Sequence, residues 1–240
     1  MPVVECAVIK LRQGFNELDL YEQLMEGLDA QDDWVRCHQP HLLRGKRYQH
    51  KVRHDQENLS SLYMTHTDPA YLLVTAPWDS PETHGEWLKS DENKTTFSGF
   101  YECHLSPDAD AVSVCHVVPS GTATTPRSSS CSSRPPTFKK AFHVEKRLVD
   151  RADKDAAQRV LEELIAAAKE AGDQVWAGWT VKDSSGAEHD EEIEELIIFS
   201  EREYDFGIGR TKQSFLFNPI TVPNPVIVGG GEEDDDEGSS

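Results

Sequence analysis

The spacing of hydrophobic residues changes along this chain, most clearly between residues 68 and 93. Residues 71–76 are a continuous apolar run of strand length, and Pro77 predicts its end, because proline has no backbone N–H for a sheet. Ser80 followed by Pro81 predicts a helix start, with serine as N-cap and proline in the first turn. At 3.6 residues per turn, the predicted helix presents one face made of His84, Trp87 and Leu88.

The chain up to residue 118 predicts four strands and two helices. The strands are predicted at residues 3–11, 62–65, 71–76 and 111–118, and the first is apolar on both faces. One helix is predicted from Asn16 to Leu28, with asparagine as its N-cap, and the other follows Ser80. The order β-α-β-β-α-β is that of a ferredoxin-like unit.

The second part of the chain begins in the same order. A strand at 138–149 precedes a strongly amphipathic helix at 153–171, which Gly172 ends, and strands follow at 174–181 and 194–200. The remaining residues are rich in glycine and proline and predict a degenerate second helix and an extended last strand. The pattern therefore predicts an internal repeat.

Residues 119–136 separate the two halves. They consist mainly of Ser, Thr, Pro and Gly, which cannot bury apolar surface, so they predict a flexible linker. The predicted domains are a first half at 1–118 and a second, degenerate half at 137–228. Residues 229–240 form an acidic tail that is predicted to be disordered.

One sequence run carries a family resemblance. It reads Trp-Asp-Ser-Pro-Glu-x-His-x-x-Trp-x-x-Ser from Trp78 to Ser90, and Asp-Pro-x-Tyr-Leu-Leu at 68–73 precedes it. The run resembles the antibiotic-biosynthesis-monooxygenase-like branch of the dimeric α+β barrel superfamily. Members include cofactor-independent oxygenases of polyphenols, haem-degrading enzymes, polyketide cyclases and proteins without known activity, so the resemblance implies a fold rather than a reaction.

The predicted fold class is α+β. One four-stranded sheet with helices on one face leaves an apolar face bare, and a second sheet can cover it by closing a barrel. In the family two identical chains usually do this. Here the internal repeat predicts that two ferredoxin-like repeats form an intramolecular dimeric α+β barrel, as a monomeric pseudo-dimer or a homodimer.

Composition narrows the possible partners and the compartment. The net charge of −19 argues against nucleic acid, and no apolar run approaches the roughly 20 residues of a membrane helix. Five cysteines without CxxC spacing predict neither a disulfide framework nor a zinc site. A reducing, cytoplasmic location is therefore expected, with a small aromatic or polyketide molecule as substrate.

Residues 36–53 stand apart from the acidic background. They contain six Lys and Arg residues, including Arg44 and Arg47, and no acid. This segment could attract an anionic substrate at a pocket mouth, or it could be a solvated face that pairs with acids elsewhere.

Two histidines are the candidate catalytic residues. His84 could accept a phenolic proton, and His116 shares its strand face with Val112, Val114 and Val118, where it would be a lone polar group if that face lines the lumen. For the substrate, Trp78 and Trp87 could form an apolar wall, and Tyr71 and Tyr101 could orient a hydroxyl group. The alternative for each is a packed, hydrogen-bonded core residue.

No metal or other cofactor is predicted. Cys37, His38 and His41, with His50 and His54, lie in a segment that has neither helical periodicity nor carboxylates to complete a metal site. Haem-degrading relatives resemble one another in an Asn on the first strand, and residues 3–11 contain none. The predicted function is cofactor-independent oxygenation of an aromatic or polyketide metabolite. A cyclase or lyase using the same pocket, and a non-catalytic binding or stress-response protein, are the alternatives.

Overall fold

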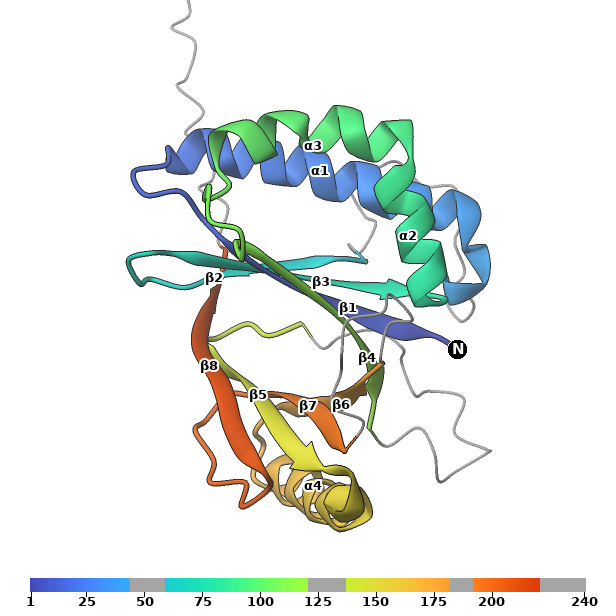
Figure 1. The fold of residues 1–240 in the computed structure, drawn as a ribbon, viewed down its shortest axis with the longest axis vertical. Coiled ribbons are helices and arrows are strands. Elements are labelled where there is room, and N and C mark those ends of the chain that lie inside the picture. Colours follow the sequence, from blue (N-terminus) through green and yellow to red (C-terminus); the bar gives the residue numbers. More distant parts are fainter. Residues whose placement is uncertain (44–58, 121–136, 182–191, 221–240) are drawn as a thin grey trace, which may run out of the picture.

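A closed barrel of eight antiparallel strands forms the centre of the molecule (Figure 1). The computed structural model describes residues 1–43, 59–120, 137–181 and 192–220. Most of the predicted linker, the acidic tail, Arg44, Arg47, His50 and His54 lie outside the described residues. None of the helices in the described ranges is long and apolar enough to span a membrane.

The described residues of the first half form four strands and three α-helices. In chain order the elements are β1 (Val3–Lys10), α1 (Glu17–His38), the 3-10 helix η1 (Pro40–Leu43), β2 (Ser61–Met64), β3 (Tyr71–Trp78), α2 (Pro81–Lys89), α3 (Asp91–Cys103) and β4 (Val112–Pro119).

In the part of the second half that the structure describes there are four strands and one α-helix. Its elements are β5 (Phe142–Asp150), the 3-10 helix η3 (Arg151–Asp153), α4 (Lys154–Glu170), β6 (Val175–Thr180), β7 (Ile193–Ser200) and β8 (Arg210–Pro219).

Both halves have the same strand order. The first half reads β4-β1-β3-β2 and the second reads β8-β5-β7-β6, so each places its own fourth, first, third and second strand side by side. The β2–β8 and β4–β6 pairs join the halves and close the barrel. Helices α1, α2 and α3 cover the first sheet, whereas α4 covers the second on the opposite side (Figure 1).

The barrel interior is an apolar core that both halves share. Its residues come from the strands of both halves, and they can contact one another because they point into the lumen. It contains Val4, Cys6, Tyr63, Leu73, Val117, Phe138, Phe142, Val144, Ile197, Phe199 and Phe217. Side chains at alternate strand positions face the helices instead.

The prediction that Pro77 ends its strand is wrong. Strand β3 continues to Trp78, and Pro77 lies opposite Val4 of β1. On its other side β3 pairs with β2 up to Thr75, which lies opposite Ser61, and no other described residue forms a strand pair beyond that point. The backbone of β1 bonds to β3 at odd-numbered residues such as Leu11, so the N–H that Pro77 lacks would point to this open side.

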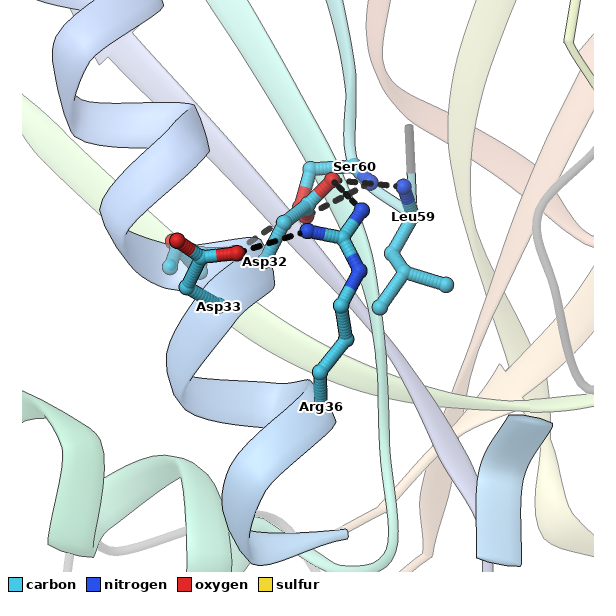
Figure 2. Close-up of polar contacts among 6 residues, drawn as sticks. Asp32, Asp33, Arg36, Leu59 and Ser60 are labelled. Atoms are coloured by element: carbon cyan, nitrogen blue, oxygen red, sulfur yellow. Dashed lines mark hydrogen bonds and ion pairs between the residues drawn. The ribbon is translucent and has the colours of Figure 1, made fainter. Parts of the chain in front are cut away.

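Helix α1 continues to His38, ten residues past the predicted end. The apolar stripe is interrupted at Gln31 and Asp32, yet both are buried. The Asp32 carboxylate accepts hydrogen bonds from the backbone N–H groups of Leu59 (2.6 Å) and Ser60 (3.1 Å), and from the Ser60 hydroxyl (2.7 Å), as Figure 2 shows. These bonds fix the start of the chain that leads into β2.

Figure 2 also shows how the first arginine of the basic segment is used. Arg36 donates a hydrogen bond to Asp33 (2.9 Å), and its guanidinium lies 3.7 Å from the Asp32 carboxylate. Arg36 therefore pairs with acids of its own helix.

Two further predictions about helices are wrong. Leu88 does not share the buried face of His84 and Trp87, because its side chain is 45% exposed. In the second half no second helix forms in residues 201–209, which the structure describes as bends and irregular chain before the extended strand β8.

Candidate active site

The register of β1 places one acidic residue beside one of the predicted histidines. Glu5 pairs with Ala76 of β3 on one side and with His116 of β4 on the other. Its neighbours Val4 and Cys6 belong to the lumen core, so the Glu5 side chain points to the helix layer. The same alternation turns His116 to this layer, because its neighbour Val117 faces the lumen. The strand face of His116 therefore does not line the lumen, which was the condition for His116 to be a lone polar group there.

Helix α2 brings His84 to the same place. Ser80 caps the helix: its hydroxyl accepts a hydrogen bond from the Thr83 N–H (3.4 Å), and the Thr83 hydroxyl accepts one from the Ser80 N–H (3.1 Å). This capping box fixes the first turn, and His84 follows directly. His84 Nδ1 lies 2.9 Å from His116 Nε2, a hydrogen bond between two buried imidazoles.

The Glu5 carboxylate completes the group. Its Oε2 accepts a hydrogen bond from the Trp78 indole N–H (2.8 Å) and lies 3.5 Å from His84 Nε2. The Trp78 ring lies against the His84 ring, with 4.7 Å between the ring centroids. We refer to Glu5, His84, His116 and Trp78 as the histidine cluster.

Burial dominates the electrostatics of the histidine cluster. It raises the pKa of Glu5 from 4.5 to about 7, although the Trp78 hydrogen bond and the nearby His116 both lower it. The carboxyl group of Glu5 can therefore gain or lose a proton near neutral pH. Since an imidazole also titrates in this range, the cluster can accept a proton and pass it between neighbours.

The histidine cluster is closed to solvent in this structure. His84 is 2% exposed, Glu5 5% and His116 6%. Trp34 and Trp87 pack with Trp78 in one apolar group, with 5.8 Å between the ring centroids of Trp34 and Trp87. A substrate could contact the histidines only after helix α2 or its neighbours move.

The other predicted site residues lie at different places relative to the histidine cluster. Trp87 is buried in the apolar group just described. Tyr101 lies on α3, 43% exposed, and close enough to Glu5 that the carboxylate adds to the effect of burial in raising the pKa of the phenol. Tyr71 faces the lumen, where its ring centroid lies 5.0 Å from that of Phe215, so it does not join the cluster.

Glu5 is the site residue that the sequence reasoning missed. The strand at 3–11 was interpreted as apolar on both faces, although Glu5 is the one acid within it. A buried acid within an otherwise apolar stretch of strand is uncommon and is itself a signal of function.

The described part of the chain shows no group of three or more His, Cys, Asp or Glu residues that could hold a metal ion. In the histidine cluster, the nearest nitrogens of His84 and His116 contact each other directly. Zinc–nitrogen bonds are about 2.0–2.1 Å long, so an ion between these two atoms would need a wider separation.

A cavity of about 660 Å³ lies elsewhere, beside the β2–β8 seam. Its apolar lining includes Leu20 and Leu24 of α1 and Met64 of β2, and Lys139 and Lys140 are among its polar lining residues. This volume suits a small molecule.

No family model and no curated protein sequence matches this chain. Among solved structures, a proposed monooxygenase of Fusobacterium nucleatum is similar over 92% of this chain and 93% of its own, with a TM-score of 0.52 and 7% identity. The chain shares the fold of that protein, a closed α+β barrel. A proposed monooxygenase of Lactobacillus acidophilus is similar over 91% of this chain and 93% of its own, with a TM-score of 0.47 and 8% identity. At such identities the likeness of this α+β barrel concerns the fold alone.

Proposed function

We propose that this α+β barrel is an oxygenase that acts on a small aromatic or polyketide metabolite without a bound cofactor. The observation that carries this proposal is the hydrogen bond between His84 and His116 beside a carboxyl group whose pKa lies near 7. A buried acid–base group of this kind is typical of catalytic sites. The Fusobacterium protein of the same fold, itself a proposed monooxygenase, is consistent with this chemistry.

In the proposed reaction the histidine cluster removes a proton from a phenol. His84 or His116 accepts the proton, and Glu5 stabilises the resulting imidazolium when its carboxyl group is ionised. The electron-rich phenolate then transfers an electron to dioxygen, and the phenoxyl radical and superoxide combine into a peroxide anion at a ring carbon. The cluster returns its proton to this anion, and the resulting hydroperoxide loses water, with the hydrogen of the same ring carbon, to leave a quinone.

Tryptophan side chains supply the apolar surroundings that this reaction needs. Trp78 lies against the ring of His84, and Trp87 belongs to the same apolar group on the helix side of the sheet. They would hold an aromatic ring and exclude water, which strengthens the electrostatic effect of Glu5. Tyr101, half exposed above Glu5, is the residue that we expect a substrate hydroxyl group to meet first.

Oxygen uptake tests the proposal directly. The purified, metal-stripped protein should consume dioxygen with a panel of di- and trihydroxylated naphthalenes. His84→Ala and His116→Ala should each lower the rate by about 100-fold or more. His104→Ala is the matched control: His104 is equally buried but lies 3.0 Å from Asp19 rather than in the cluster, so its loss should leave the rate nearly unchanged.

Two other outcomes would reassign the protein. A product formed without oxygen uptake would indicate a cyclase or lyase that uses the same cluster only for proton transfer. A ligand that binds and is returned unchanged would indicate a binding protein, and the 660 Å³ cavity beside the β2–β8 seam is the observation that favours this second candidate.

The architecture carries a proposal of its own. We infer that the shared strand order reflects two ferredoxin-like repeats, the second of which has lost a helix, and that the chain is a pseudo-dimer in the cytoplasm. Native mass measurement should then find the monomer, or a homodimer that forms through another surface.

A further inference from the structure

Two cysteines face each other inside the barrel. Cys6 of β1 and Cys115 of β4 are direct partners in the strand register, and both are free thiols. Cys6 belongs to the lumen core and Cys115 packs against it. The Cys115 thiol lies 3.6 Å from the Cys6 carbonyl oxygen, to which it donates a hydrogen bond in its neutral form.

The register also gives the type of strand pair. Lys10 N–H donates to the carbonyl oxygen of Ala111 (2.7 Å), and such hydrogen-bonded pairs recur every second residue along antiparallel strands. Four residues earlier on β1, Cys6 and Cys115 therefore form a hydrogen-bonded pair, with Cα atoms about 5.5 Å apart. Disulfides span Cα separations of about 4.4–6.8 Å, so the two cysteines are within reach of each other.

A disulfide at this position would be strained and readily reduced. Directly opposed strand residues have Cβ atoms about 4.5–5.5 Å apart, at the wide end in hydrogen-bonded pairs, whereas a relaxed disulfide has about 3.8 Å. Closing this gap requires β1 and β4 to approach, and strained disulfides are the labile and regulatory ones.

The two thiols differ in their surroundings. Cys115 is half-buried and can meet a small oxidant, whereas Cys6 is fully buried. A hydrogen bond from the Cys6 thiol lowers the pKa of Cys115, and the Lys146 ammonium lowers it further, against the effect of burial. The same hydrogen bond and burial raise the pKa of Cys6. Cys115 is therefore the attacking thiolate and Cys6 the resolving thiol.

We propose that Cys6 and Cys115 are an oxidation site, where hydrogen peroxide forms a reversible disulfide across β1 and β4 inside the barrel. The Cys115 thiolate attacks one peroxide oxygen, which yields a sulfenic acid and hydroxide. The Cys6 sulfur then attacks the sulfenic sulfur, and the Cys6 proton leaves with the sulfenic hydroxyl group as water. The proton that the Cys115 thiol released when it ionised neutralises the hydroxide. Two thiols and one peroxide thus give one disulfide and two water molecules.

Oxidation at this site would change the geometry of the histidine cluster. Glu5 and His116 are also register partners. Glu5 directly precedes Cys6 in β1, and His116 directly follows Cys115 in β4. The approach of β1 and β4 needed for the disulfide therefore displaces two members of the cluster. This consequence holds whether or not the cluster is an oxygenase site.

Peptide mapping of the folded protein tests the proposal. Cys103 and Cys115 share one tryptic peptide, because no Lys or Arg lies between Lys94 and Arg127. The experiment therefore uses the Cys103→Ser variant, which changes an exposed cysteine of α3. After brief exposure to a tenfold excess of peroxide and alkylation, the peptides of Cys6 and Cys115 should be joined, with a loss of two hydrogen atoms. A dithiol reductant should separate them.

Two variants and two possible disulfide patterns test the assignment of the cysteines. Cys115→Ser should leave Cys6 reduced, and Cys6→Ser should leave Cys115 as a sulfenic acid that a dimedone probe labels. If Cys6 and Cys115 stay alkylated while exposed Cys37 is oxidised, the pair is only part of the core and the proposal is wrong. Disulfides that join Cys115 to Cys37 or Cys131 instead would also contradict it.

Discussion

Glu5 in the first half and Glu145 in the second occupy equivalent positions on the first strand of their half. Each follows a valine of the lumen core, Val4 or Val144, and each points to the helix side of its sheet. Both are nearly buried, with exposures of 5% and 6%. Each half thus has one buried carboxylate in its sheet, and the two carboxylates differ in the groups that they contact.

The second half gives its carboxylate a permanent cation. Arg147 donates a hydrogen bond to Glu145 (2.8 Å) and another to the carbonyl oxygen of Ile208 (2.6 Å), and its guanidinium lies 5.3 Å from the centroid of the Phe206 ring. Ile208 and Phe206 come from residues 201–209, which stand where the first half has helices α2 and α3. The irregular segment therefore holds Arg147 beside Glu145, and an arginine side chain keeps its positive charge at all ordinary pH values.

In the first half α2 supplies the partner, which is an imidazole and not a permanent cation. His84 takes the place of an arginine near Glu5, with Trp78 as the hydrogen-bond donor. The comparison shows a buried carboxylate in both halves, and in the half that contains α2 the pKa of this carboxyl group is raised to about 7. We therefore assign proton transfer to the first half and structural support to the second.

Removal of the second-half cation should have the largest effect. Arg147→Met leaves Glu145 buried without its partner, so the free energy of unfolding should fall by about 3–5 kcal/mol. The double variant Glu145→Gln/Arg147→Met should recover most of this loss, because it removes the uncompensated charge. Urea unfolding measures both. A loss below 1 kcal/mol in the single variant would mean that the pair is effectively solvated.

Stability as a function of pH should separate the two carboxylates. The pKa of Glu5 is raised in the folded state, so that state binds the proton more tightly than the unfolded chain does. The contribution of Glu5 is therefore most favourable below pH 4.5 and declines as the pH rises through about 7, by about 3 kcal/mol in total. Glu5→Gln should abolish this decline.

Trp78→Phe sharpens the same test. The indole hydrogen bond lowers the pKa of Glu5, so its removal should move the decline to higher pH. A decline that Glu5→Gln leaves intact would show that another group causes it.

Helix caps should give the smallest effect. Ser80 makes a capping box at the start of α2, whereas Asp153 at the start of α4 makes no side-chain capping hydrogen bond. Ser80→Ala should therefore cost about 1 kcal/mol, and Asp153→Ala less. Ser80→Ala should also lower the oxygen-uptake rate, since His84 follows the cap by one turn. Equal stability losses at both caps would contradict the assignment.

Local patterns predicted most elements of the fold but few of their contacts. The N-caps Asn16 and Ser80 were predicted from residue type alone, because their bonds lie within one turn. The end of α1 was missed because its buried face includes Gln31 and Asp32, whose partner Ser60 lies 28 residues beyond Asp32. Polar residues that are buried because they bond to residues far along the chain interrupt the apolar periodicity from which a helix is predicted.

The candidate site shows the same limit. His84 and His116 were both identified by type and position, whereas their direct contact depends on the pairing of β1 with β4, about 110 residues apart. The side to which His116 points follows from which sheet face the helices cover. The strand pattern, apolar on both faces, cannot give that choice.

Infrared titration of the Glu5 carboxyl group is the most direct measurement of the central claim. The C=O stretch of a protonated carboxylic acid should disappear with a midpoint near pH 7, and the band should be missing in Glu5→Gln. His84→Ala should shift its midpoint, whereas Arg147→Met should not, because Arg147 belongs to the other half. A Glu5 carboxyl group that ionises at its ordinary value near 4.5 would contradict the account, because the first half would then hold no exchangeable proton on Glu5 at neutral pH.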